Sequence, residues 1–278
     1  MCLNCKSLIN AINRYIIKAD DNLEKLLEEE GRVESKKTVK YISAIERETA
    51  EALVAETEYF ISEIEKCDNL EQAEKIFKKI KNNDFCLEKL KPVFKEKFAS
   101  LIKLSAKGYI KKTDGELTIS KLSKRTVAWI EDWSGELADI MRINSHKEIE
   151  NILKKGLENG DSVAVFTQNI LESGIRDEYY KARRVAVTEV LRAHNTARQE
   201  AFLQDPSVCE KMWRHTGGHR NEPRYNHMDM DGQRVRKDEP FELIGKDGGI
   251  YYPMHPCDSN LPPEESINCH CIAQPVVS

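Results

Sequence analysis

The sequence predicts an α+β fold: a mostly α-helical N-terminal region over residues 1–175, then a small α+β module over residues 176–278 with a long helix and short antiparallel strands. Apolar side chains recur every three or four residues through most of the first region, which is the pattern of amphipathic helices. Eight of the nine prolines follow Ala201, and six of the seven histidines follow Leu191. Lysine outnumbers arginine in the first region, and arginine outnumbers lysine in the second. The first region therefore has the composition of solvated helix faces, and the second that of fixed, planar hydrogen bonding.

The apolar repeat places each helix in turn. The third expected helix has Asp68 as its cap, and a Ser145–Glu148 capping box opens the sixth. The first helix ends at Gly31, the sixth at Gly156 or Gly160, and the last before Pro206. The expected helices cover residues 8–27, 39–64, 70–80, 85–104, 127–140, 145–156, 162–172 and 177–203.

Short strands are expected mainly after Pro206. Asp-Gly pairs between short alternating runs predict two hairpins, over residues 109–119 and 228–236. Further strands are expected at residues 212–215, 250–252 and 268–272. In the last of these, alternation would turn the side chains of Cys269 and Cys271 to the same, inward face.

The composition excludes several classes of protein. The 278 residues carry 43 basic and 47 acidic side chains, so there is no global basic footprint for nucleic acid or an acidic membrane. No apolar run approaches the ~20 residues of a membrane span. The first residues lack the order of a secretory signal, so we expect neither export nor membrane insertion. The eight cysteines are then reduced thiols or metal ligands.

Cysteine and histidine near the C-terminus suggest a metal site. Zinc takes four thiolate or imidazole ligands, and the candidates are His227, Cys257, Cys269 and Cys271. The alternative is a set of buried thiols without metal, because the usual two-residue spacing between cysteines is missing. We expect the second arrangement, and no cofactor. Cys2 and Cys5 have the usual spacing, but no second pair is near them.

Two other functions have candidate residues. His227, Asp229 and Asp231 loosely resemble the cluster of a metal-dependent nuclease or toxin-like enzyme, although carboxylates in Asp-Gly turns commonly serve the turn. Residues 214–237 carry six basic and three acidic side chains and could touch DNA phosphates. The alternative is a solvated hairpin with arginines that brace its own loops.

Polar residues form a stripe on the last long helix. Arg184, Thr188, Arg192 and Asn195 follow one another at steps of four, four and three, so they share a face. Most polar side-chain bonds serve the fold. The stripe therefore predicts an intramolecular hydrogen-bond network with the α+β module.

The order of these features resembles the C-terminal domain of the phage Mu F-like minor head proteins, the phage head morphogenesis family, over about residues 145–278. The residues that carry the resemblance are Thr188, Glu189, Asn195, Trp213, Arg224, His227, Asp231, Gly232, Asn268, Cys269 and Cys271. The chain departs from the family at Val187, where arginine is common, and at Ser266, where histidine is common. Many members also carry Cys-x-x-Cys where this chain has Arg224 and His227, so a zinc site here would need Cys257 or His255 as a substitute ligand.

The resemblance implies a structural role in a tailed phage or prophage. Such minor capsid proteins associate with the portal and with capsid or scaffold proteins, and they influence head assembly and the packaged DNA. The implied location is the virion, at the capsid interior or portal vertex, and the host cytoplasm during assembly. It implies no catalysis.

Overall fold

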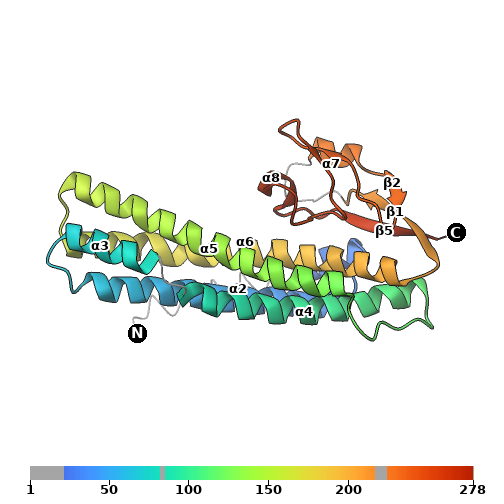
Figure 1. Cartoon of the computed structure of the whole chain (residues 1–278), viewed down its shortest axis with the longest axis horizontal. Coiled ribbons are helices and arrows are strands. Elements are labelled where there is room, and N and C mark those ends of the chain that lie inside the picture. Colours follow the sequence, from blue (N-terminus) through green and yellow to red (C-terminus); the bar gives the residue numbers. More distant parts are fainter. Residues whose placement is uncertain (1–21, 82–84, 217–223, 278) are drawn as a thin grey trace. The chain divides into compact units, whose positions relative to one another are not determined.

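The computed structural model describes residues 22–81, 85–216 and 224–277 (Figure 1). Residues 22–29 are helical and end at Gly31, which has the left-handed φ of 69° expected at a helix stop. The elements that follow are α2 (Ser35–Ile64), α3 (Leu70–Lys81), α4 (Phe85–Thr113), α5 (Lys124–Asn159), α6 (Val163–Gln204), β1 (Val208–Arg214), α7 (Tyr225–Asp229), β2 (Arg234–Arg236), β3 (Leu243–Ile244), β4 (Ile250–Tyr251), α8 (Pro263–Ser266) and β5 (Ile272–Val277). The α+β class and the helical N-terminal region are confirmed. No helix among the described residues is both long and apolar enough to cross a membrane.

The chain divides into two compact units. Unit 1 contains residues 1–42, 100–123 and 188–278, and unit 2 contains residues 43–99 and 124–187. Three of the four boundaries fall inside α2, α4 and α6, and the fourth falls directly before α5. The contacts thus divide the chain elsewhere than at residue 175, and the boundary expected there stays a prediction.

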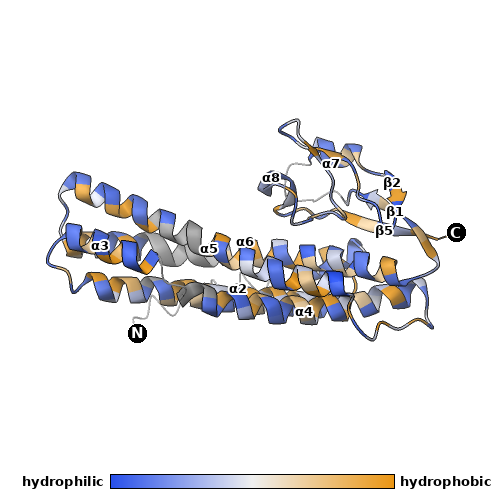
Figure 2. Cartoon of the chain, in the orientation of Figure 1, coloured by the Kyte–Doolittle hydropathy of each residue, from blue (hydrophilic) through white to orange (hydrophobic). Residues whose placement is uncertain are grey.

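Unit 2 is helical and has one core. Apolar stripes on its helices (orange in Figure 2) face inward, as the three- and four-residue spacing predicts. Phe60 packs edge-on against Phe77, with ring centroids 5.3 Å apart, and also against Phe166. The core residues are Phe60, Ile61, Ile64, Leu70, Ala73, Phe77, Ile80, Ile149, Leu153, Phe166 and Ile170.

The C-terminal half of α6 is the centre of unit 1. Every side chain from residue 188 to residue 202 is buried, so this part of the helix is covered on all sides. His194 bonds to Thr38 and Tyr109, which come from α2 and α4. Asn195 bonds to carbonyls in the C-terminal segment. The α+β module is thus built on α6, as expected.

Two small antiparallel sheets complete unit 1. One has the order β2-β1-β5, and the other pairs β3 with β4. In the larger sheet, Arg214 of β1 pairs with Ile272 of β5, and Met212 pairs with Arg234 of β2. The central strand β1 begins four residues before the expected strand, and β4 lies where a strand was expected.

The hairpin expected over residues 109–119 is wrong, because α4 continues through Thr113. Tyr109 and Ile110 are buried at helical spacing, and the backbone N–H of Asp114 still donates to the carbonyl of Ile110 at 2.8 Å. The Asp114 carboxylate then accepts from the backbone N–H of Glu116 at 2.9 Å. Asp-Gly therefore forms a turn that ends a helix instead of joining two strands.

Other predicted helix ends are also wrong. The third helix is capped by Asn69, whose side-chain oxygen accepts from the N–H of Gln72 at 3.0 Å, and not by Asp68. The capping box at Ser145 opens no helix, because α5 runs through it to Asn159. Residues 162–172 and 177–203 belong to one helix, α6, which contains no proline. Gly160, at φ 70°, is the stop that α5 uses.

The second hairpin and the last strand are corrected as well. Residues 225–229 form helix α7, and β2 pairs with β1 instead of with residues 228–230. β5 begins only at Ile272, so Cys269 and Cys271 precede the strand. Asn268, at φ 53°, has a left-handed backbone that a strand excludes. Cys269 and Cys271 are nevertheless buried, as predicted.

Candidate metal centre

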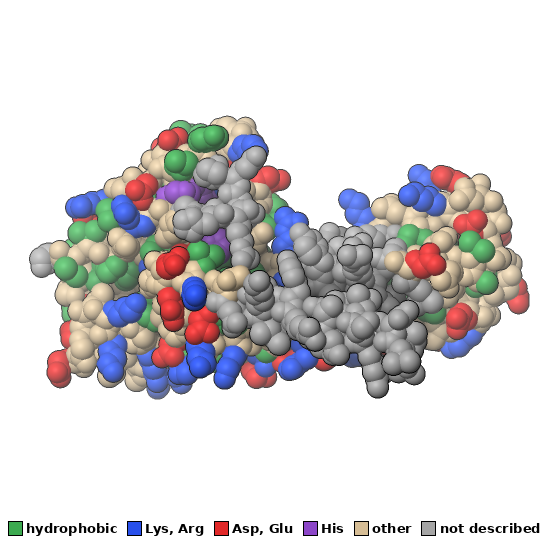
Figure 3. All heavy atoms as spheres, turned by 180° about the vertical axis from the view of Figure 1, so that it is seen from behind, with side chains coloured by type: hydrophobic (Ala, Val, Ile, Leu, Met, Phe, Trp, Pro, Cys, Tyr) green, Lys and Arg blue, Asp and Glu red, His purple; other side chains and the backbone are tan. Residues whose placement is uncertain are grey.

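Two cysteine and two histidine side chains lie near one another at one end of the larger sheet. Cys269 and Cys271 lie between α8 and β5, and His227 lies on α7. The β1–β5 register pairs Arg214 with Ile272, which brings His215 beside Cys271. Histidine side chains reach the surface of this part of the molecule in Figure 3.

The sulfur and ring nitrogen atoms lie close together. The Nδ1 atom of His227 is 3.5 Å from the Sγ of Cys269 and 3.7 Å from the Sγ of Cys271. The Nδ1 atom of His215 is 3.5 Å from the Sγ of Cys271. One ligand atom each from His227, Cys269 and Cys271 lies within 4.8 Å of the others, and all three residues are buried. Among the described residues, no other group of His, Cys, Asp or Glu side chains converges in this way.

A buried carboxylate fixes the orientation of His227. Its Nε2 atom lies 2.8 Å from the carboxylate of Glu265, and both side chains are almost fully buried. Glu265 also accepts from the backbone N–H of Lys246 at 2.7 Å and from the amide of Asn226 at 3.0 Å. Burial alone would lower the pKa of His227, but the hydrogen bond to Cys269 and the charge of Glu265 outweigh it and raise this pKa. When Nε2 donates its N–H to Glu265, the neutral His227 ring carries its lone pair on Nδ1, which faces the two sulfurs.

The pKa values of the three cysteines are shifted in different directions. Hydrogen bonds from Cys257, Cys271 and His227 lower the pKa of Cys269 well below its usual value. Burial, followed by the hydrogen bond to Cys269, raises the pKa of Cys257 well above its usual value. The hydrogen bond to Cys269 and burial do the same for the pKa of Cys271. Cys269 is thus the thiol that ionises first in this cluster.

Cys257 lies beside the cluster but points at the backbone. Its thiol donates to the carbonyl of Cys269 at 2.8 Å and reaches the carbonyl of Ser266 at 3.6 Å. His255, the other expected substitute, has both ring nitrogens engaged: Nδ1 lies 2.9 Å from the carbonyl of Pro256 and Nε2 lies 3.3 Å from Thr196. The structure therefore places neither residue among the converging ligand atoms.

The polar stripe of α6 holds the backbone around the cluster. Arg192 donates to the carbonyl of Cys257 at 2.7 Å and pairs with Glu189 at 3.0 Å. The amide of Asn195 donates to the carbonyls of Pro256 and Cys271, at 2.9 and 3.1 Å. These bonds are intramolecular, as the stripe predicted.

The two ends of that stripe behave differently. Thr188 accepts from the backbone N–H of Asn268 at 3.2 Å, which helps hold the left-handed residue before the cysteines. Arg184 is exposed and lies in unit 2, so it takes no part in the network.

Comparison with known proteins finds a family that matches part of this sequence. Residues 147–274 match the family described as "Phage Mu protein F like protein". This part of the chain is a Mu F-like domain. The match supports a role in phage head morphogenesis, the role that the motif order implied.

The sequence is also similar to one curated protein, whose name gives no activity. The chain is 40% identical over 164 residues to "Uncharacterized protein YqbB" of Bacillus subtilis strain 168. The match covers 59% of this chain and 52% of the relative, so the chain spans about half the length of that protein. No solved structure gives a significant match.

The remaining motif residues of the Mu F-like domain also serve its internal structure. Arg224 donates to the carbonyl of Ile267 at 2.7 Å. Asp231 accepts from the backbone N–H of His215 at 2.8 Å, and Gly232, at φ 87°, donates its N–H to the carbonyl of Trp213 at 2.9 Å. These motif residues thus hold the backbone that surrounds the Cys/His cluster.

Trp213 lies on one side of the Cys/His cluster. Its ring packs edge-on against His227, with centroids 5.7 Å apart, and against Phe241 at 5.3 Å. Its indole Nε1 is buried without a conventional hydrogen-bond partner in the described structure. The same indole N–H favours the ionised form of Cys271, although this does not offset the net rise in that pKa.

The nuclease-like arrangement of the Mu F-like domain is not assembled. His227 is buried against Glu265 and the cysteines, whereas Asp229 and Asp231 are exposed. Asp231 is instead paired with Arg214 at 3.2 Å. The three side chains do not converge among the described residues. Helix α7 turns His227 inward and Asp229 outward, and Asp231 lies in the turn after the helix.

Sequence reasoning missed two residues of the site, His215 and Glu265. His215 ends the strand predicted over residues 212–215 but lies just after β1, and its neighbour depends on the register of β5. Glu265 lies in the short helix α8, within a proline-rich segment that gave no sequence signal. Neither position could be linked to His227 without the fold.

Proposed function

We propose that this protein is a minor head protein of a tailed phage that contacts the portal and procapsid during head assembly. The Mu F-like match over residues 147–274 carries the proposal. The buried motif residues support it, because a domain stabilised internally in this way suits a structural part more than an exposed catalytic cleft.

Head assembly itself tests this proposal. A tagged chain expressed during phage growth should co-purify with portal protein and with procapsids, and tryptic peptides of the chain should be found in purified heads. Heads without these peptides, from a lysate that contains the soluble protein, would contradict the proposal.

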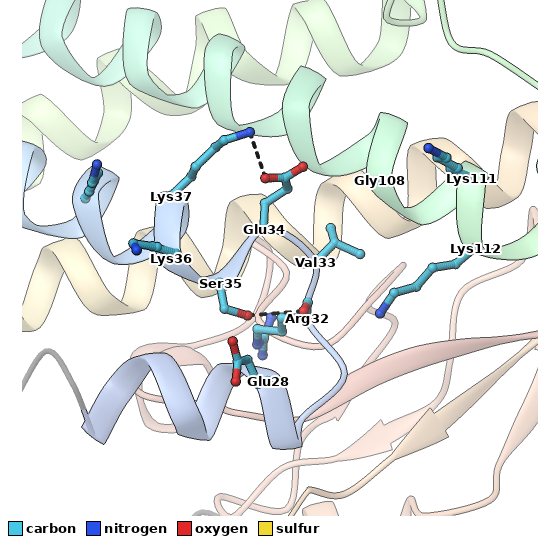
Figure 4. A pocket seen from close by; sticks show the side chains of 11 residues that line it. Glu28, Arg32, Val33, Glu34, Ser35, Lys36, Lys37, Gly108, Lys111 and Lys112 are labelled. Carbon is cyan, nitrogen blue, oxygen red and sulfur yellow. Dashed lines mark hydrogen bonds and ion pairs between the residues drawn. The ribbon is translucent and has the colours of Figure 1, made fainter.

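A lysine-rich groove supports contact with DNA. An open groove of ≈ 860 Å³ lies in unit 1 between the first turns of α2 and the last turns of α4, and a second hollow of ≈ 500 Å³ continues along the same helices. Figure 4 shows Lys36 and Lys37 on α2 across the groove from Lys111 and Lys112 on α4. The exposed lysines that line the two hollows are Lys36, Lys37, Lys40, Lys103, Lys107, Lys111 and Lys112.

Few acids oppose these lysines. Glu28 and Glu34 are the acids that line the larger hollow, and Glu34 pairs with Lys37 at 2.8 Å. Lys103, Lys107 and Lys111 follow one another at steps of four, so they stand about 6 Å apart along one face of α4. Such a row of exposed ammonium groups suits the phosphates of a DNA backbone, which binds without reading sequence.

Charge reversal in this groove tests the contact. Lys103→Glu/Lys107→Glu/Lys111→Glu should weaken binding to duplex DNA at least tenfold at low salt. If three phosphate contacts are lost, the slope of log K against log salt should become shallower by about 2.7. Fluorescence anisotropy of labelled DNA across a salt series measures both quantities.

A matched variant controls for net charge. Lys75→Glu/Lys78→Glu/Lys79→Glu changes three exposed lysines of α3, in unit 2, by the same total charge. It should keep most of the affinity. Equal losses in the two triple variants would show that only net charge matters and would overturn the groove as the DNA contact.

A further inference from the structure

We propose that His215, His227, Cys269 and Cys271 bind one zinc ion as a closed, structural site with two sulfur and two nitrogen ligands. The spacing of the cysteines in the sequence predicted thiols without metal. The folded geometry leads to the opposite proposal, for three reasons.

The first reason is the set of distances. In a tetrahedral site with Zn–S about 2.3 Å and Zn–N about 2.0–2.1 Å, a sulfur and a nitrogen ligand stand about 3.5 Å apart. The two Sγ–Nδ1 distances to His227 are 3.5 and 3.7 Å, and the Sγ–Nδ1 distance from Cys271 to His215 is 3.5 Å. Three of the distances between ligand atoms that a tetrahedral zinc site requires are therefore already present in the folded chain.

The second reason is the carboxylate behind His227. Metal-binding histidines almost always give their second ring N–H to a carboxylate, a carbonyl or water, which fixes the tautomer and the ring orientation. Glu265 holds Nε2 at 2.8 Å, and its own oxygens are held by Lys246 and Asn226. This support leaves Nδ1 as the donor atom, directed between two sulfurs.

The third reason concerns the fourth ligand. A thiolate at Cys257 would place a negative sulfur 2.8 Å from the carbonyl oxygen of Cys269, which accepts the Cys257 proton in the folded chain. That repulsion disfavours Cys257 as a ligand. His215 is half-buried at the end of β1, and the one side-chain contact shown for its ring is with Cys271. A turn of this ring toward Cys269 closes the tetrahedron.

The ligand set selects the metal and its role. Thiolate with imidazole suits zinc, while calcium and magnesium require oxygen ligands. Four protein ligands leave no open position for water or substrate, so the ion is structural and not catalytic. It joins α7, the end of β1 and the segment before β5.

Metal content and cobalt spectra test the site in the full-length protein. Purified protein should contain about one zinc per chain after dialysis. Co²⁺ added to the demetallated protein should give the visible bands of a tetrahedral ion and a thiolate charge-transfer band. A chelator should lower the melting temperature, because the metal-binding free energy is part of the folding free energy.

Variants identify the ligands. His215→Ala and Cys271→Ser should lose the zinc and the cobalt bands. His215→Cys should keep the metal and strengthen the charge-transfer band, since a third thiolate is added; this rescue separates a ligand from a residue needed only for folding. Cys257→Ser and Cys209→Ser, which changes an exposed cysteine, are the matched controls and should keep about one zinc.

Three results would overturn the proposal. They are wild-type protein without zinc or cobalt bands, His215→Cys without metal, and loss of metal in Cys257→Ser with retention in His215→Ala. None depends on head assembly or DNA, so failure here leaves the proposed function untouched.

Discussion

A single buried histidine, His194, links three helices in unit 1. Its Nδ1 lies 2.9 Å from the Tyr109 hydroxyl, and its Nε2 lies 2.8 Å from the Thr38 hydroxyl. Arg198 lies over the Tyr109 ring, 4.5 Å from the centroid. Burial, together with the charges of Arg32 and Arg198, lowers the pKa of His194 well below 6.5. The imidazole is therefore neutral in the folded protein.

This neutrality predicts a loss of stability in mild acid. The unfolded chain protonates His194 below pH about 6.5 while the folded chain does not, so the unfolded state binds more protons and stability falls with falling pH. The contribution of this residue falls by up to about 1.4 kcal/mol per pH unit. Urea unfolding between about pH 7.5 and about pH 5.5 should show this loss.

The substitution His194→Gln isolates the effect. Glutamine cannot take up a proton in this pH range. Near neutral pH the variant should be less stable than wild type by about 1–3 kcal/mol, because buried hydrogen bonds of His194 are lost. The difference in free energy of unfolding between the two proteins should then narrow as the pH falls. A constant difference across the window would contradict the assignment of the acid sensitivity to His194.

Residue roles were predictable from sequence only where local pattern decides them. Cys269 and Cys271 are buried as the flanking apolar residues predicted, although both precede β5 and so do not alternate within a strand. The role of His194 did not follow, because Thr38 and Tyr109 lie 156 and 85 residues away along the chain. Glu265 lies 38 residues from His227, which is also too far for a local pattern to link the two side chains.

At the scale of elements, a glycine lets α4 approach the chain that leads into α2. A Cβ on Gly108 would lie 3.0 Å from both Cβ and Cγ2 of Val33, a buried residue. The Cβ of Val33 is fixed by its backbone, so a change of rotamer cannot relieve the contact. Close packing of helix and loop therefore depends on the missing side chain.

Gly108→Ala should therefore destabilise the protein. Alanine in a helix gains about 1 kcal/mol of propensity over glycine, whereas overpacking of a tight contact costs about 1–3 kcal/mol. We expect a net loss of about 1 kcal/mol in the free energy of unfolding. Adding Val33→Ala should recover part of the Gly108→Ala loss, and a double-mutant cycle measures the coupling. Simple additivity of the two changes would contradict the proposed clash.

Elements were predictable where an apolar repeat was long and ended at a distinct stop. The repeat over residues 39–64 and the run over residues 70–80 correspond to α2 and α3. Short polar signals misled instead: Asp114-Gly115 follows a helix, and the Ser145 box lies inside α5. Turn residues and caps permit an end, but tertiary packing decides whether the helix uses it.

At the scale of the whole molecule, the residues at either end of the described chain meet in unit 1. Glu30 pairs with Arg32 at 2.7 Å and with His270 at 2.5 Å, and all three side chains are mostly or fully buried. Arg32 also donates to the carbonyl of His270 at 3.2 Å. Arg198 joins the carbonyls of Gly31 and Ala273, both at 3.0 Å. Unit 1 is therefore complete only when sequence-distant segments are together.

This closure sets an order for folding during synthesis. All residues of unit 2 precede residue 188, so its phenylalanine core can form before residues 188–278 have left the ribosome. Residues 22–42 must wait for residues 268–273, because Glu30 pairs with His270, 240 positions later in the chain. Nascent chains arrested after about residue 230, so that all of unit 2 has left the ribosome tunnel, should resist protease within residues 43–99 and remain sensitive near Gly31. Protection of Gly31 at that stage would contradict the order. Residues 268–273 thus act as a latch on residues 30–32, and a ribosome that stops before them leaves unit 1 open.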